Sequence, residues 1–140
     1  MSRQKTLELM VRRPAEVGRL CGFPRLSDWL HGSWLRQMLL GRGDLTLLAH
    51  RGSCKTTCLC IAIAELMLLQ PEAHILFLRK TDADVAEVLR QVQRLLRGGI
   101  LQELSARLYG TPVRISRATV NELSLDCQQT ARGAAQLLGT

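Results

Sequence analysis

The sequence predicts an α/β fold, with a mostly parallel sheet flanked by helices, from three observations. The 140 residues suit one domain, which at this length can bury a core. Only five aromatic residues are present, so Leu, Ile, Val and Ala must build that core, which favours helices packed on a parallel sheet over an all-β sandwich. Short apolar runs also alternate with helical patterns along the chain, as parallel βαβ units require.

The first part of the chain, residues 1–43, is expected to be an N-terminal helical arm. Residues 1–25 are basic and contain two prolines, so a short helix or an irregular segment is expected there. Ser27 is a suitable cap for a helix that runs to about Leu40, where a Gly-rich turn ends it. Residues 44–140 are then expected to form the core of the domain, with no internal repeat.

Two strands and a helix open this core. The run Leu45–Ala49 is short, apolar and bounded by turn residues, which predicts a fully buried strand. Lys55–Leu69 is apolar nearly all round, which predicts a buried helix that Pro71 ends. A second buried strand is expected at Ile75–Leu78.

The next helix has a clear beginning, face and end. Thr81 with Asp84 three residues later resembles a capping box, and Gly98 follows the last apolar residue. The apolar face that the spacing predicts consists of Val85, Val88, Leu89, Val92, Leu95 and Leu96. The opposite side carries Arg90, Arg94 and Arg97, which can contact DNA phosphates or form a solvated face.

The remaining elements are shorter. A third helix is expected at about Leu101–Leu108. Pro112–Arg117 and Thr119–Leu125 are two extended segments that suit a hairpin at the edge of the sheet, and Ala134–Leu138 suits a further strand.

The segment between the first strand and its helix carries the chemistry. It approximates the phosphate-binding pattern GxxxxGK followed by Ser or Thr, with Lys55 and Thr56 in register. Ala49 and Cys54 stand where the pattern has glycine. The residues predicted to bind ATP are Ala49, His50, Arg51, Gly52, Ser53, Cys54, Lys55, Thr56 and Thr57.

The chemistry of a polyphosphate explains these positions. Amides in the loop form an anion nest, and the start of the helix adds partial positive charge. Lys55 is expected to contact the β- and γ-phosphates, and the Thr56 hydroxyl to ligate Mg²⁺. Gly52 permits unusual backbone angles, whereas Cys54 must adopt a conformation more common for glycine. The alternative is an ordinary strand–turn–helix with a surface lysine.

These residues resemble the ATPase part of phage terminase large subunits, the motors that package viral DNA. The similarity runs from Leu45 through the loop to Phe77–Thr81, and extends weakly to Trp34 and to residues 135–139. P-loops of that family often replace the first glycine and carry Arg followed by Gly, as Arg51 and Gly52 do here. The resemblance implies a P-loop NTPase-like fold and a catalytic role for Arg51, at the γ-phosphate, beside Lys55.

A second short run also resembles the family. Arg79–Lys80–Thr81 would lie at the edge of the ATPase core near nucleotide or DNA. The alternative is a basic strand end followed by a helix cap.

The acid that a working ATPase needs is poorly represented. Glu122 and Asp126 are the candidates, but a serine interrupts the apolar run before Asp126, which is better interpreted as a surface residue than as a metal ligand. In the resembled family the acid would follow soon after residue 139, and a nuclease domain would come later. We therefore expect an incomplete P-loop ATPase core, a fragment with weak or no turnover, whose enzymatic status is uncertain.

The sequence thus predicts the ATP-binding portion of a terminase-like packaging motor. ATP and Mg²⁺ are the expected cofactors. Double-stranded DNA and other motor subunits are the expected partners of the complete protein, in the cytoplasm of a host cell and without a membrane. Two alternatives remain: another P-loop ATPase, helicase-like or recombinase-like, and a small basic nucleic-acid-binding domain that never meets nucleotide. The net charge of +7 suits a polyanionic partner in each case.

The five cysteines indicate no framework of disulfides or zinc, because their number is odd and none shows the CxxC spacing. Cys58 and Cys60 are expected in the core. Cys54 is expected to be the most reactive thiol, because it precedes a helix and is followed by Lys55.

Overall fold

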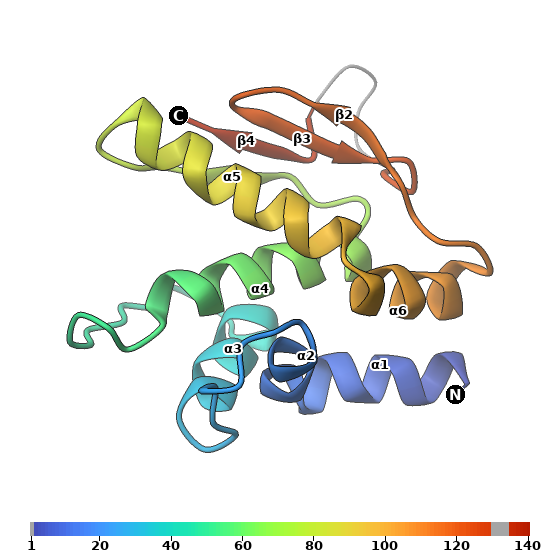
Figure 1. The fold of residues 1–140 in the computed structure, drawn as a ribbon, viewed down its shortest axis with the longest axis horizontal. Helices are drawn as coiled ribbons and strands as arrows, with labels where there is room; N and C mark the ends of the chain where they lie inside the picture. Colours follow the sequence, from blue (N-terminus) through green and yellow to red (C-terminus); the bar gives the residue numbers. More distant parts are fainter. Residues whose placement is uncertain (1, 130–134) are drawn as a thin grey trace.

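The computed structural model describes residues 2–129 and 135–140 and shows a mixed α/β fold. Figure 1 shows α5 lying between the sheet and α4, with the N-terminal helices on the far side of α4. The elements, in chain order, are α1 (Arg3–Arg12), α2 (Pro14–Leu20), α3 (His31–Leu40), α4 (Lys55–Leu69), β1 (Ile75–Phe77), α5 (Asp82–Arg97), α6 (Gly99–Tyr109), β2 (Ile115–Ala118), β3 (Glu122–Leu125) and β4 (Leu137–Gly139).

Helix α4 is the centre of the core, and its predicted bounds are confirmed. Helices pack on more than one of its sides, which explains why its sequence is apolar nearly all round. Its last carbonyl groups have partners elsewhere in the chain: Met67 O accepts from Gln136 Nε2 at 2.7 Å, and Leu68 O accepts from the Tyr109 hydroxyl. Within the described part of the chain, neither α4 nor any other helix combines the length and the apolarity that crossing a membrane requires.

Helix α5 also forms as its sequence predicts. The Thr81 hydroxyl accepts a hydrogen bond from the amide of Asp84 at 3.2 Å, which caps the first turn. The six residues of the expected apolar face are buried, so this face joins α5 to α4 and to the sheet. The predicted third helix is confirmed as α6, which begins directly after Gly98.

The first 40 residues are more regular than expected, because α1 and α2 are both helical. Pro14 occupies the first turn of α2, where its missing N–H costs nothing. Met10, Ala15 and Val17 are fully buried in the same core cluster as the residues of α4. Helix α3 ends at Leu40 as predicted, but it begins at His31 with Leu30 as the N-cap residue, so the expectation that Ser27 caps it is wrong.

The sheet is mixed, so the expectation of a mostly parallel sheet is wrong. Its strand order is β1-β4-β3-β2, and only β1 and β4 run parallel. Both β2–β3 and β3–β4 are antiparallel. The physical reason is the connection: a helical crossover separates β1 from the later strands, whereas a tight turn joins β2 to β3 and forces the chain to reverse.

The predicted hairpin is confirmed, with β2 at one edge of the sheet. In its turn the Thr119 amide donates to the carbonyl of Glu122 at 2.8 Å, and the Thr119 hydroxyl accepts from the Glu122 amide at 3.0 Å. The further strand near the C-terminus is β4, slightly later than expected; Ala134, at the start of the predicted segment, lies outside the described residues.

The first predicted strand is also wrong. Leu45–Ala49 forms no regular secondary structure and pairs with no strand among the described residues, and Leu48 is 90% exposed. Leu45 and Leu47 instead line a groove of about 380 Å³ with residues of α3, α4 and β1. Apolar composition favours burial, but a strand also needs a neighbour that accepts its backbone hydrogen bonds, and the ladders of the sheet pair β1 only with β4.

Candidate phosphate-binding loop

The loop before α4 contains two residues with positive φ, a backbone conformation that favours glycine. Gly52 has φ of 85°, and Cys54 has φ of 67° with ψ of 28°, which is the left-handed helical region. Cys54 is the only non-glycine residue with positive φ in the described part of the chain. The unusual conformation expected at Cys54 is therefore confirmed, and a side chain at this position carries a steric cost.

The start of α4 presents uncapped amides. The first intrahelical bond runs from the Cys58 amide to the carbonyl of Cys54 at 3.0 Å. Helix geometry leaves the amides of Lys55, Thr56 and Thr57 without a partner inside the helix. The N-cap side chain makes no hydrogen bond, and the first turn contains no acidic residue. This end of a 15-residue helix therefore carries uncompensated positive charge.

Two polar side chains of the loop differ sharply in their contacts. Lys55 Nζ donates to the carbonyl oxygen of Ala49 at 2.6 Å, so the ammonium group reaches back across the loop. Ser53 is only 7% exposed, and within the described structure its hydroxyl oxygen has no hydrogen-bond partner. A buried hydroxyl without a partner is uncommon in folded proteins.

The other predicted ATP-binding side chains face solvent. His50, Arg51 and Thr56 are exposed, and Thr57 is half-buried. Because the loop projects from the end of α4 (Figure 1), these side chains are free to approach a ligand from outside.

Sequence patterns did not reveal the contact between His31 and this loop. His31 begins α3, and its Nε2 lies 2.9 Å from the carbonyl oxygen of Ser53 in a buried setting. The two residues are 22 positions apart, and an isolated histidine has no spacing that would link it to a loop.

The candidate acids lie away from the loop, on the β2–β3 hairpin. Glu122 forms an ion pair with Arg117 at 2.7 Å. Asp126 accepts from the amide of Arg114 at 3.2 Å and returns a backbone bond to it at 2.9 Å. Both acids thus stabilise the hairpin, which supports the interpretation of Asp126 as a surface residue. Among the described residues no three His, Cys, Asp or Glu side chains gather in a group that could hold a metal.

The basic run after β1 includes the residue that caps α5 and a residue that bonds to the chain beside the end of β4. Thr81 caps α5, as described above. The backbone amide of Arg79 donates to the carbonyl of Thr140 at 3.2 Å, next to the end of β4. Burial raises the pKa of Cys60 to about 11, and the positive charge of Arg79 partly offsets that rise, so Arg79 lies near the first half of α4.

No family model, curated protein or solved structure matches this chain. The resemblance to terminases therefore depends on the residues of the loop and of Phe77–Thr81.

Proposed function

We propose that the start of α4 binds the phosphates of ATP, and that the chain is the nucleotide-binding part of a terminase-like DNA-packaging ATPase. The observation that carries the proposal is the conformation of Cys54. A left-handed residue directly before an uncapped helix, followed by Lys55, directs several amides and one ammonium group toward the same end of α4.

The contacts of the loop assign a part to each residue. Lys55 has three N–H donors and gives one to Ala49, so donors remain for the β- and γ-phosphates. The hydroxyl of Ser53 has unused hydrogen-bonding capacity beside the same amides. Arg51 is exposed and can offset charge on the γ-phosphate.

The metal site is less complete than the phosphate site. Thr56 carries an exposed hydroxyl in the first turn of α4, which suits a ligand of Mg²⁺. When bound, Mg²⁺ would neutralise charge on the β- and γ-phosphates. Glu122 and Asp126 are engaged in the hairpin, so neither supports Thr56 as a second ligand. We therefore expect nucleotide binding with slow or absent hydrolysis.

The assignment to a packaging motor comes from the resemblance at residues 49–57 and 77–81. Double-stranded DNA and other motor subunits are the partners that this assignment implies. Another P-loop ATPase, helicase-like or recombinase-like, would use the same loop. DNA-dependent changes in nucleotide affinity with blunt duplexes, but not with forked or single-stranded DNA, would favour the packaging motor.

A second candidate function rests on α5. Arg90, Arg94 and Arg97 are all exposed along this helix, and the ion pairs found among the described residues involve none of them. A basic stripe of this kind can bind nucleic-acid phosphates without any nucleotide at the loop.

Titration with a fluorescent ATP analogue, with and without Mg²⁺, tests the proposal. Lys55→Ala should weaken binding by about 10- to 100-fold, because hydrogen bonds to charged groups contribute about 1.5–3 kcal/mol. Lys5→Ala is the matched control, since it removes the same charge from the exposed surface of α1. Equal affinity of both variants and the unchanged protein would reject the loop as the site. Absence of any binding, together with salt-dependent DNA binding that α5 variants abolish, would favour the second candidate.

A further inference from the structure

We propose that His31 is a positioning residue that holds the loop at Ser53 and Cys54 in its phosphate-binding shape. The inference deepens the proposed function and depends on it for its effect on nucleotide. The contact that carries it joins His31 Nε2 to the carbonyl oxygen of Ser53 at 2.9 Å.

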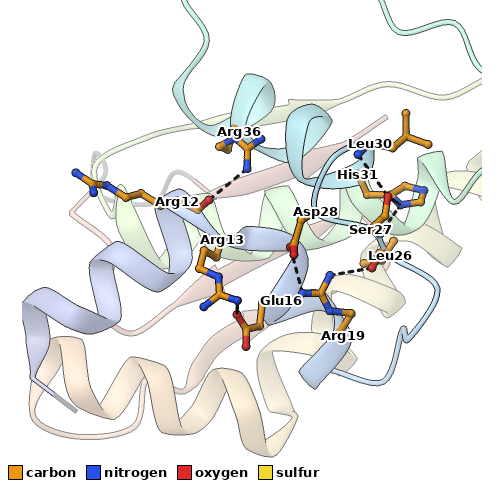
Figure 2. A network of polar contacts seen from close by, with 10 residues as sticks. All are labelled: Arg12, Arg13, Glu16, Arg19, Leu26, Ser27, Asp28, Leu30, His31 and Arg36. Atoms are coloured by element: carbon orange, nitrogen blue, oxygen red, sulfur yellow. Dashed lines mark hydrogen bonds and ion pairs between the residues drawn. The ribbon is translucent and has the colours of Figure 1, made fainter.

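The partners of the imidazole determine which nitrogen carries the proton. The backbone amide of Ser27 lies 2.9 Å from Nδ1, and an amide can only donate, so Nδ1 must be the unprotonated nitrogen (Figure 2). In the neutral ring the proton is then on Nε2, which donates to the carbonyl of Ser53. Only the neutral Nε2–H tautomer satisfies both partners, so His31 is a directional link between α3 and the loop.

The ring is also fixed by its surroundings. His31 is only 7% exposed, so water does not compete for the bond to the loop. The ring of Trp34 lies edge-on at 5.1 Å between centroids, with an interplanar angle of 85°.

The segment before α3 is held in turn by α2. Arg19 donates to the carbonyl of Leu26 at 2.9 Å and pairs with Asp28 at 3.1 Å, on either side of Ser27 (Figure 2). The carbonyl of Ser27 accepts from the amide of Gly32 at 2.9 Å. Ser27, whose amide donates to Nδ1 of His31, is thus held by both α2 and α3, while Nε2 of the same ring donates to the loop.

The planarity of the peptide bond converts this anchor into an orientation of the loop. In a trans peptide, the carbonyl of Ser53 and the amide of Cys54 point in opposite directions. Because His31 holds that carbonyl toward the buried side, the amide of Cys54 points away from it. The amide of Cys54 then joins the free amides at the start of α4, where the proposed phosphates lie.

Two substitutions separate this role from simple packing. His31→Phe keeps a ring beside Trp34 but removes both nitrogens, whereas His31→Gln keeps one acceptor and one donor. We expect His31→Phe to weaken binding of the fluorescent ATP analogue about tenfold, the effect of losing one hydrogen bond, and His31→Gln to restore most of it. His74→Phe is the control, since His74 is exposed and contacts Ala135. A folded His31→Phe variant with unchanged affinity would overturn the proposal.

A second measurement needs no nucleotide, so it tests the role of His31 even when the proposed function is rejected. Ring ¹⁵N chemical shifts should show an unprotonated Nδ1 and a protonated Nε2 at His31. Hydrogen exchange at the amides of Ser53 and Cys58, which donate to the carbonyls of His50 and Cys54, should accelerate in His31→Phe and remain near the unchanged rate in His31→Gln. A proton on Nδ1, or equal exchange in all variants, would show that His31 does not position the loop. Both of these results without any nucleotide binding by the unchanged protein would retain the link between His31 and the loop and would reject the proposed function.

Discussion

Lys55 and Ala49, six residues apart, are joined by a hydrogen bond of 2.6 Å from the ammonium group to the carbonyl oxygen. The bond ties the first residue of α4 to the end of the exposed segment that precedes the loop. His31 in turn holds the carbonyl of Ser53, two residues before Lys55. Two contacts thus restrain a loop that includes a strained residue, Cys54, which lies between them.

The conformation of Cys54 predicts that glycine is better tolerated at this position. Cys54→Gly should raise the free energy of unfolding by about 0.5–1 kcal/mol. A left-handed backbone costs a non-glycine residue about 1–2 kcal/mol, which glycine avoids. Part of this stabilisation is lost because glycine has more conformational freedom in the unfolded chain. Urea denaturation measures the change. Cys54→Ala is the control, since alanine keeps the steric cost and should give no comparable gain. A loss of stability in Cys54→Gly would contradict the assigned conformation.

The thiols should react at very different rates. Burial raises the pKa of Cys21 and Cys60 to about 11 and that of Cys58 to about 12, and it also raises the pKa of Cys127, so few of these thiols are ionised at pH 8. Cys54 stands instead at the start of a helix. Limited alkylation at pH 8 followed by peptide mass spectrometry should find Cys54 labelled first. Earlier labelling of Cys21 or Cys127 would refute this order.

Glu65 should make the protein less stable as the pH rises. It is fully buried in α4, neither carboxylate oxygen has a partner in the described structure, and burial raises its pKa well above the ordinary value. A raised pKa in the folded state means that the folded protein holds the proton more tightly. The stability from protonated Glu65 is therefore complete below the ordinary glutamate pKa, and is lost as the pH rises through the raised folded pKa.

Glu65→Met should remove this dependence. We expect the variant to gain about 1–3 kcal/mol at pH 8, the cost of burying a polar group without a partner, and to gain less at pH 4. Urea denaturation at both pH values checks this. Glu8→Met, at an exposed position of α1, should show no such difference between the two pH values. Equal gains at pH 4 and pH 8 would rule out ionisation of Glu65 as the cause.

Gly139 should be sensitive to the smallest enlargement. A Cβ atom at this position in β4 would lie 2.4 Å from Val85 Cγ1 and 3.0 Å from Leu89 Cδ1, so β4 and α5 would have to separate. Gly139→Ala should destabilise the protein by about 1–3 kcal/mol, as overpacking does. Thermal or urea unfolding measures it, and Gly99→Ala is the control, because no atom lies within 4 Å of its Cβ. Similar effects of the two variants would contradict this packing of β4.

Local patterns were reliable where one stretch of chain contained the whole signal. Thr81, Gly98 and the six apolar residues between them specify the start, the end and the buried face of α5. The apolar Lys55–Leu69 stretch specifies a helix enclosed on most sides. The turn around Thr119 specifies the hairpin, because its hydrogen bonds join residues only three positions apart.

The same patterns failed where a partner from elsewhere was needed. Leu45–Ala49 has the composition of a buried strand, yet no strand in the part of the chain that the structure describes accepts its backbone bonds. The prediction of a mostly parallel sheet also failed, because β4 pairs in parallel with β1 on one side but antiparallel with β3 on the other.

By itself the sequence determined α4, α5, α6 and the hairpin, since each depends on side chains a few residues apart. Only the tertiary structure decided the mixed sheet, the contact of His31 with Ser53, and the burial of Glu65 with no hydrogen-bond partner among the described residues. Those features join distant segments, and the physical reason is that hydrogen-bond partners and burial depend on how the whole chain packs, which no local pattern encodes.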